Sequence, residues 1–189
     1  MVGMAESAIQ VAEVRSTLEI DQVRDLLRGF VAWHRERHVE DLRLIDAYFD
    51  PRVFDAELAG LPGSYARPSG RLLLARLDGE PVGCVALKRI DSSACEMKRM
   101  FVRPTSQGQG AGRALAEAVV DEARAAGYAT MWLDTSVRQT EAQALYLSLG
   151  FEPAAPYYEM TPELAAWLVF LRKDLSASSE RAVSARGRA

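Results

Sequence analysis

The sequence has few cysteines, few histidines and no long hydrophobic run. Its 189 residues include two cysteines and two histidines, which excludes a disulfide-rich scaffold and offers no Cys/His spacing typical of a zinc site. No apolar run is long enough to cross a bilayer, and the N-terminal residues lack the charged-then-apolar pattern of a secretion signal. Cys84 and Cys95 lie in apolar stretches, which is typical of buried thiols. We therefore expect a cytoplasmic protein with no metal and no membrane partner.

An excess of positive charge is also absent. Lys and Arg total 23 against 26 Asp and Glu, a formal net charge of −3, which argues against a nucleic-acid partner. Hydrophobic residues make up 49% of the chain and charged residues 26%, the proportions of a globular domain. We expect this domain at 9–174, between a disordered leader at 1–8 and a disordered Ser/Ala/Arg-rich tail at 175–189.

Apolar periodicity predicts a mixed α/β (α+β) order of elements. Alternating or short apolar runs predict strands at 9–15, 71–77, 82–90, 95–102, 129–134, 151–160 and 166–174. Helical spacing predicts helices at 21–38, 40–49, 51–59, 110–126 and 139–149. Ser16 or Thr17 can cap the first helix, Asp78-Gly79 is a hairpin turn signal, and Gly127 is typical of a helix end. An antiparallel meander followed by a βαβ unit predicts a mixed sheet with helices on both faces.

A polar loop with three alternate glycines joins the predicted strand at 95–102 to the predicted helix at 110–126. Gly108, Gly110 and Gly112 remove side chains where the chain turns, so successive backbone N–H groups can point at one place. The helix that follows adds the positive end of its dipole. The loop therefore indicates a site for a phosphate-bearing ligand, with a tight turn that binds nothing as the alternative.

Two common phosphate-binding motifs do not fit this loop. A P-loop needs a lysine and a hydroxyl residue where Arg113 and Ala114 stand. A dinucleotide site needs different glycine spacing, and here several polar residues separate the strand from the glycines. The pattern that remains, Gln107-x-x-Gly110-x-Gly112, resembles the acetyl-CoA signature of the GCN5-related N-acetyltransferase (GNAT) family.

A second motif carries the same resemblance. The run from Gln139 to Phe151 is similar to the family's Asn-x-x-Ala-x-x-Leu-Tyr-x-x-x-Gly-Phe, with Gln139 where the family commonly has Asn. The resemblance covers about 9–174. It implies a mostly antiparallel sheet of six to seven strands with a central βαβ acetyl-CoA site. It also implies an acyltransferase that moves acetyl from acetyl-CoA directly to an amine.

The resemblance assigns the cofactor contacts. In the family, the glycine loop holds the pyrophosphate of coenzyme A, and the end of the preceding strand holds the pantetheine arm and polarises the thioester carbonyl. The residues of this chain that match are Met100, Phe101, Val102, Gln107, Gly108, Gln109, Gly110, Ala111, Gly112, Arg113 and Gln139.

Tyr146 matches the tyrosine that protonates the departing thiolate in the family. A phenol has a pKa of about 10 and a thiol a pKa of about 8.5. Because these values are close, the phenol can give its proton to the thiolate with only a small shift in pKa. The alternative is an aromatic residue that packs into the core.

Glu96 matches the glutamate base of the histone-modifying members, and a carboxylate in a half-buried cleft is suited to taking a proton. The alternative role for Glu96 is a salt bridge to Lys98 or Arg71. A base at this position is not required, since many family members that act on small molecules use no dedicated base. Strict alternation puts Glu96, Lys98, Met100 and Val102 on one face of the strand, and Met97, Arg99 and Phe101 on the other.

The acceptor is less clearly marked. Candidate contacts are Trp33, His34, His38, Asp134, Tyr157 and Tyr158. The long insert at 40–70 is suited to closing over a small substrate, which favours a small-molecule amine. Two alternatives stay open: an acetyltransferase that acts on a protein N-terminus or lysine, and a non-catalytic acyl-CoA-binding module. A homodimer, common in the family, is compatible with the sequence.

Overall fold

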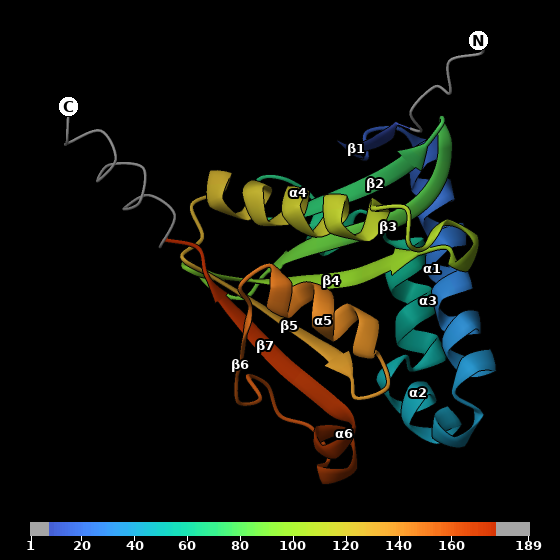
Figure 1. Ribbon diagram of the computed structural model, residues 1–189, viewed down its shortest axis with the longest axis vertical. Helices are drawn as coiled ribbons and strands as arrows, with labels where there is room; N and C mark the ends of the chain where they lie inside the picture. The colour runs from blue at the N-terminus through green and yellow to red at the C-terminus, as the bar shows by residue number, and fades with distance from the viewer. Residues whose placement is uncertain (1–7, 177–189) are drawn as a thin grey trace.

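A seven-stranded sheet organises the computed structural model, which describes residues 8–176 (Figure 1). Its strand order is β1-β2-β3-β4-β5-β7-β6. The strands are β1 (Ile9–Glu13), β2 (Arg71–Leu77), β3 (Glu80–Arg89), β4 (Ala94–Val102), β5 (Thr130–Ser136), β6 (Glu152–Pro153) and β7 (Leu168–Asp174). Neighbouring strands are antiparallel except for the parallel pair β4 and β5. The mixed, mostly antiparallel sheet that the sequence predicts is confirmed.

Helices cover both faces of the sheet (Figure 1). They are α1 (Thr17–Arg37), α2 (Leu42–Tyr48), α3 (Pro51–Ala59), α4 (Ala111–Ala125), α5 (Thr140–Ser148) and α6 (Pro162–Trp167), with short 3-10 helices at Val39–Asp41, Gly63–Tyr65 and Pro104–Ser106. Helices α1, α2 and α3 share an apolar cluster with Leu72, Leu74 and Phe101, whereas α4 and α5 pack on the other face. None of the helices in the described part of the chain is long and apolar enough to span a bilayer.

Local signals explain most of the helix ends. Ser16 caps α1 and forms a capping box with Glu19. Pro51 begins α3, where its missing N–H costs no helical hydrogen bond. Gly127 follows α4 with a φ of 86°, the conformation that ends many helices. The expected leader at 1–8 and tail at 175–189 lie outside the described residues except for Ala8, Leu175 and Ser176, and Leu175 is buried in the core.

Strands β4 and β5 pair over a short stretch and then separate. Their ladder contains only Ala94↔Thr130, Cys95↔Met131 and Glu96↔Trp132. Beyond it, β4 continues to Val102 and β5 to Ser136 without pairing with each other. Figure 1 shows the two strands diverging, with the start of α4 beside the end of β4. The sheet is therefore split at its centre, and the second half of β4 is not paired with β5.

A β-bulge in β4 breaks the alternation that the sequence predicts. Lys98 pairs with Ala86 and Phe101 with Cys84, so β4 has one residue more than β3 over this interval. The extra residue is accommodated at Arg99, whose φ is 56°.

The bulge changes the side of the sheet on which the last residues of β4 lie. Arg99 contacts Glu57 of α3, on the same side as Glu96 and Lys98. Met100 instead packs with the α4 and α5 cluster. The prediction that Met100 and Val102 share a face with Glu96 is therefore wrong, because strict alternation does not survive an inserted residue.

The chain after α5 differs from the prediction. The predicted strand at 151–160 is reduced to Glu152–Pro153, so Tyr157 and Tyr158 lie in a loop. Prolines cannot donate to a strand ladder, and Pro153 and Pro156 interrupt this segment. The predicted strand at 166–174 begins only at Leu168, because Thr161 caps the short helix α6 before it.

Candidate active site

Three cavities follow one another through the split between β4 and β5. The first, here the loop cavity, is about 390 Å³ and lies between α1, the end of β4, the glycine loop and α5. The second, the junction cavity, is about 60 Å³ and lies inside the split. The third, the outer cavity, is about 720 Å³ and lies between α2, strands β3 and β4, and the loop before α6. Met100 and Tyr146 line both the loop and junction cavities, and Tyr48, Lys98 and Arg99 line both the junction and outer cavities.

The loop cavity gathers most of the residues that the resemblance assigns to the cofactor. Those that line it are Met100, Phe101, Val102, Gln107, Gly108, Gly112 and Gln139. Those that do not are Gln109, Gly110, Ala111 and Arg113. The other residues that line it are Phe30, Trp33, Arg37, Glu141, Ala142, Leu145 and Tyr146. The cavity is thus lined by apolar side chains along β4 and α5 and by the backbone of the glycine loop.

The glycine loop presents backbone N–H groups. Gly108 and Gly110 have φ values of 77° and 88°, which side chains disfavour. Gly110 is the N-cap of α4 and makes no side-chain cap hydrogen bond, so the first N–H groups of the helix keep their capacity to bind an anion. A Cβ atom at Gly112 would lie 3.7 Å from both Met100 Cε and Leu145 Cδ2, so a side chain there would fill the cavity.

Two polar side chains of the loop are engaged within the protein. Gln107 Nε2 donates to the Val102 carbonyl oxygen at 3.1 Å, which fixes the loop to the end of β4. The Arg113 guanidinium donates to Ser148 Oγ at 2.8 Å and to Glu117 at 3.3 Å. Arg113 therefore links α4 to α5 and does not line the cavity.

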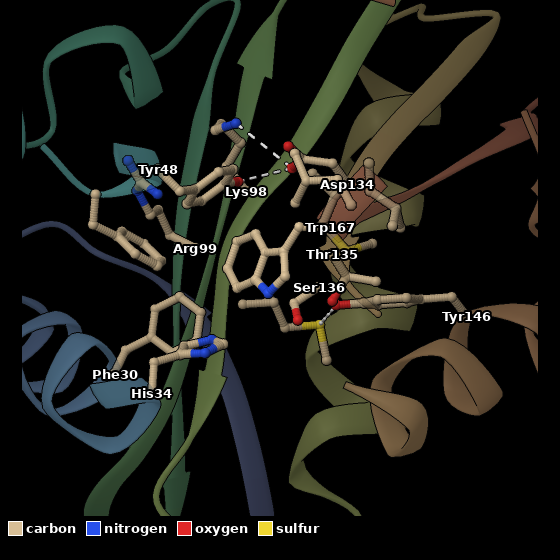
Figure 2. Close-up of a pocket in the computed structure, with 15 residues that line it drawn as sticks. Phe30, His34, Tyr48, Lys98, Arg99, Asp134, Thr135, Ser136, Tyr146 and Trp167 are labelled. Atoms are coloured by element: carbon tan, nitrogen blue, oxygen red, sulfur yellow. Dashed lines mark hydrogen bonds and ion pairs between the residues drawn. The ribbon is translucent and has the colours of Figure 1, made fainter. Parts of the chain in front are cut away.

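Tyr146 lies where the loop and junction cavities meet. Its side chain is buried, and its hydroxyl donates to Met100 Sδ at 3.6 Å. Figure 2 shows the ring reaching from α5 toward the split. Burial raises the pKa of the Tyr146 phenol, and the negative charge of Asp134 raises it further. The hydroxyl therefore holds its proton at neutral pH.

Glu96 lies in the outer cavity, beyond the junction. Its Oε1 accepts hydrogen bonds from the Tyr157 hydroxyl at 2.6 Å and from Lys98 Nζ at 2.8 Å. Of the two salt bridges weighed from the sequence, the one to Lys98 is present, whereas Arg71 binds Glu122 of α4. The Glu96 carboxylate is buried and keeps other acceptor positions beside these two bonds.

Asp134 lies in the junction cavity near the end of β5. Its side chain is 2% exposed, and it accepts hydrogen bonds from the hydroxyls of Tyr48, at 2.9 Å, and Tyr158. Lys98 Nζ lies 3.9 Å from Asp134 Oδ1, so Lys98 joins this carboxylate to Glu96. Burial raises the pKa of Tyr48 well above its usual value, and the charge of Asp134 adds to this effect. The structure thus places Asp134, a candidate acceptor contact from the sequence, at the junction cavity.

The two histidines lie near the C-terminal end of α1, next to the junction and loop cavities. His34 lines the junction cavity, and its Nδ1 is buried without a hydrogen-bond partner. The pKa of His34 is lowered from 6.5 to about 4, chiefly by burial and also by the charges of His38 and Arg37. His38 Nε2 lies 3.1 Å from Gln139 Nε2. Gln139 is therefore buried against α1 at the wall of the loop cavity.

Several lining residues were missed from the sequence. They are Phe30, Tyr48, Arg99, Ser136 and Trp167. One signal was available for Arg99, because adjacent charges in the middle of an apolar strand are unusual in a buried element. Arg99 in fact makes a bidentate ion pair with Glu57, at 2.8 and 2.6 Å. No local pattern marks the others, which come from four separate elements.

Comparison with known proteins shows the same family that the two motifs resemble. The model of the acetyltransferase (GNAT) family matches residues 24–151. An IAA acetyltransferase of Azospirillum brasilense is 42% identical over 112 residues, which are 58% of this chain and 71% of that protein. A [ribosomal protein bS18]-alanine N-acetyltransferase of Escherichia coli is 46% identical over 79 residues, 40% of this chain and 53% of that protein.

The fold comparison agrees with the sequence comparison. The crystal structure of PaiA N-acetyltransferase from Thermoplasma acidophilum, solved in complex with coenzyme A, superposes with a TM-score of 0.65. The match covers 88% of this chain and 99% of that one, at 16% identity. At that identity the likeness concerns the fold alone.

Proposed function

The chain belongs to the acetyltransferase (GNAT) family and is an acyltransferase, and on this premise we propose that it transfers acetyl from acetyl-CoA directly to the amine of a small molecule. The observation that carries the proposal is the line of three cavities, with Tyr146 at the boundary between the first two. A donor in the loop cavity and an acceptor in the outer cavity would meet in the junction cavity, beside a protonated phenol.

The loop cavity suits acetyl-CoA. The N-cap of α4 is Gly110, which makes no side-chain cap hydrogen bond, so the N–H groups at the start of this helix suit the pyrophosphate of acetyl-CoA. Met100, Phe101 and Val102 border the cavity with apolar side chains and with backbone that β5 leaves unpaired, which suits the pantetheine arm. When bound, acetyl-CoA supplies a thioester whose carbonyl carbon an amine can attack.

Two side chains move the protons of the transfer. The amine nitrogen forms a bond to the carbonyl carbon while the bond from that carbon to sulfur breaks. Tyr146 gives its hydroxyl proton to the departing sulfur and regains one, directly or through water, from the attacking nitrogen, which loses a second proton as the amide forms. Glu96 takes the proton that the acceptor ammonium must lose, directly or through water, since it lies in the cavity from which the acceptor would arrive.

The walls of the outer cavity favour a small acceptor. In the loop before α6, the Tyr157 hydroxyl donates to Glu96 and the Tyr158 hydroxyl donates to Asp134. These two hydrogen bonds hold the loop over one end of the cavity. Tyr48 of α2 closes another side. A protein acceptor is the second candidate, because the E. coli relative is by its name an alanine N-acetyltransferase of a ribosomal protein.

Thiol release tests the proposal. The protein is mixed with acetyl-CoA and either a panel of small primary amines or peptides with a free N-terminus or a lysine. We expect turnover with at least one small amine and only background release with the peptides. Higher kcat/KM for a peptide would favour the protein acceptor. Binding of acetyl-CoA without turnover of any amine would contradict the proposed reaction.

A further inference from the structure

Resting on the proposed function, we propose that the acceptor is a small zwitterion, an amine that also carries a carboxylate or phosphate. Its ammonium would lie at the floor of the outer cavity, between Glu96 and Asp134. Its anionic group would lie at the mouth, against Lys88 and Arg89 of β3.

The floor of the cavity has one negative charge in excess. The charged side chains joined at and beneath this floor are the carboxylates Glu57, Glu96 and Asp134 and the cations Lys98 and Arg99. Of the three carboxylates, Glu96 lines the outer cavity itself, Asp134 lines the adjoining junction cavity, and Glu57 pairs with Arg99. Three minus two leaves one carboxylate charge without a cation, and these side chains are at most 20% exposed. A buried charge without a partner is costly, so the floor favours a ligand that brings a positive charge.

The other titratable groups at the floor do not supply that charge. Burial and the neighbouring carboxylates raise the pKa values of Tyr48, Tyr157 and Tyr158, which leaves all three phenols neutral. His34, in the junction cavity, has its pKa lowered to about 4 and is also neutral at pH 7. None of these four groups therefore adds a positive charge to the floor near neutral pH.

Lys98 shows how this floor accommodates a primary ammonium. Its Nζ lies 2.8 Å from Glu96. It also lies 3.9 Å from Asp134 and 5.9 Å from the centre of the Tyr48 ring, and Figure 2 shows both of these residues beside Lys98. Carboxylate oxygens and tyrosine rings are the surroundings that ammonium groups prefer. The rings of Tyr157 and Tyr158 extend the same surroundings toward the outer cavity.

The mouth of the cavity has the opposite charge. Lys88 and Arg89 are exposed, and within residues 8–176 neither makes an ion pair with a carboxylate. Arg89 Nε donates to the backbone oxygen of Asp91 at 3.0 Å. Glu159 also lines the mouth, so the charged side chains that line the mouth have a net charge of one positive, and Asp91 is a further carboxylate beside Arg89, next to this lining.

The ladder sets the distance between floor and mouth. Lys98 lies opposite Ala86, and Lys88 lies two residues further along β3, opposite Glu96. Two strand residues span roughly 7 Å. An anionic group several bonds from the amine can thus reach Lys88 while the amine remains at the floor.

Matched pairs of amines test the inference. Rates of thiol release are compared for 4-aminobutyrate against butylamine, and for phosphoethanolamine against ethanolamine. We expect the anionic member of at least one pair to have a kcat/KM about tenfold higher, the effect of one or two partly exposed ion pairs. The pair that shows the larger ratio distinguishes a carboxylate from a phosphate.

Variants locate the preference. Lys88→Ala with Arg89→Ala should lower the kcat/KM ratio toward one, and Lys88→Glu with Arg89→Glu should invert it. Arg52→Ala, an exposed arginine at the start of α3, is the control and should keep the wild-type ratio. Equal rates within both pairs, or a ratio that the Lys88 and Arg89 variants do not change, would overturn this inference and leave the proposed function intact. No turnover of any amine would overturn both.

Discussion

The hydroxyl of Tyr146 donates a hydrogen bond to Sδ of Met100 across 3.6 Å. This contact joins α5 to β4 and exists because the bulge at Arg99 turns Met100 toward α5. It directs the phenolic hydrogen toward a soft sulfur acceptor at the boundary of the loop and junction cavities. The geometry suits a residue that protonates a departing thiolate.

Replacing Tyr146 with Phe should lower kcat roughly 10²- to 10⁴-fold, the range of one general acid. The affinity for acetyl-CoA in calorimetric titration should change little, because only a hydroxyl is lost. Tyr128→Phe is the control, since that hydroxyl binds the Ser69 carbonyl oxygen and Tyr128 lines none of the three cavities. A parallel loss of acetyl-CoA binding in Tyr146→Phe would show that the residue is structural.

Replacing Gly110 with Asp should weaken acetyl-CoA binding at least about tenfold, because it adds a negative charge at a site that favours anions. Gly127→Asp is a matched control at the other end of α4. The two glycines have φ values of 88° and 86°, so both variants bear similar backbone strain. Equal affinities of the two variants, measured by calorimetry on folded protein, would rule out the loop as the pyrophosphate site.

Replacing Glu96 with Gln tests the proposed base. The amide oxygen can still accept from Tyr157 and Lys98 but cannot take a proton. We expect kcat/KM to fall roughly 10²- to 10⁴-fold at neutral pH and to recover as the pH approaches the pKa of the acceptor amine. Glu159→Gln, at the mouth of the same cavity, is the control. An unchanged pH–rate profile would assign Glu96 to the salt bridge alone.

His34 should make folding stability depend on pH. Its pKa is lowered from 6.5 to about 4 in the folded protein. Between these values the unfolded chain binds the proton and the folded chain does not, so the free energy of unfolding falls as the pH drops from 6.5 to about 4. The full effect is about 3 kcal/mol. His34→Phe fits the surrounding aromatic rings and removes this dependence.

Denaturant titrations from pH 4 to pH 7 measure that dependence. The wild type should lose stability across the interval more steeply than His34→Phe. His38→Gln removes the other histidine of the chain and one of the charges that lower the pKa of His34, so most of the wild-type slope, which burial of His34 causes, should remain. Identical slopes in wild type and His34→Phe would mean that His34 is protonated in the folded protein.

Much of the fold could be predicted because its signals are local. The hairpin at Asp78-Gly79, the end of α4 at Gly127 and the cap of α1 at Ser16 each depend on a few neighbouring residues. The strand after α5 could not be predicted from apolar periodicity. The prolines in this segment prevent a continuous strand, and Thr161 caps α6. The segment therefore forms a loop followed by α6.

The same distinction applies to the site. The glycine loop and Tyr146 follow from motifs within single segments, and most of the expected cofactor residues line one cavity. Lys98 could be named from the sequence as a partner of Glu96, but the partners of Asp134 could not be found this way. Tyr48, Lys98 and Tyr158 come from α2, β4 and the loop before α6, and their contacts span up to 86 residues of sequence.

The sequence by itself determined the order of elements, the glycine loop at the start of α4 and the family, since these depend on periodicity and short motifs. Only the tertiary structure decided how the cavities are lined. The bulge at Arg99 reverses the side on which Met100 lies, and the parting of β4 from β5 opens the split. Both depend on how strands distant in sequence pair with one another, and no local preference encodes that pairing.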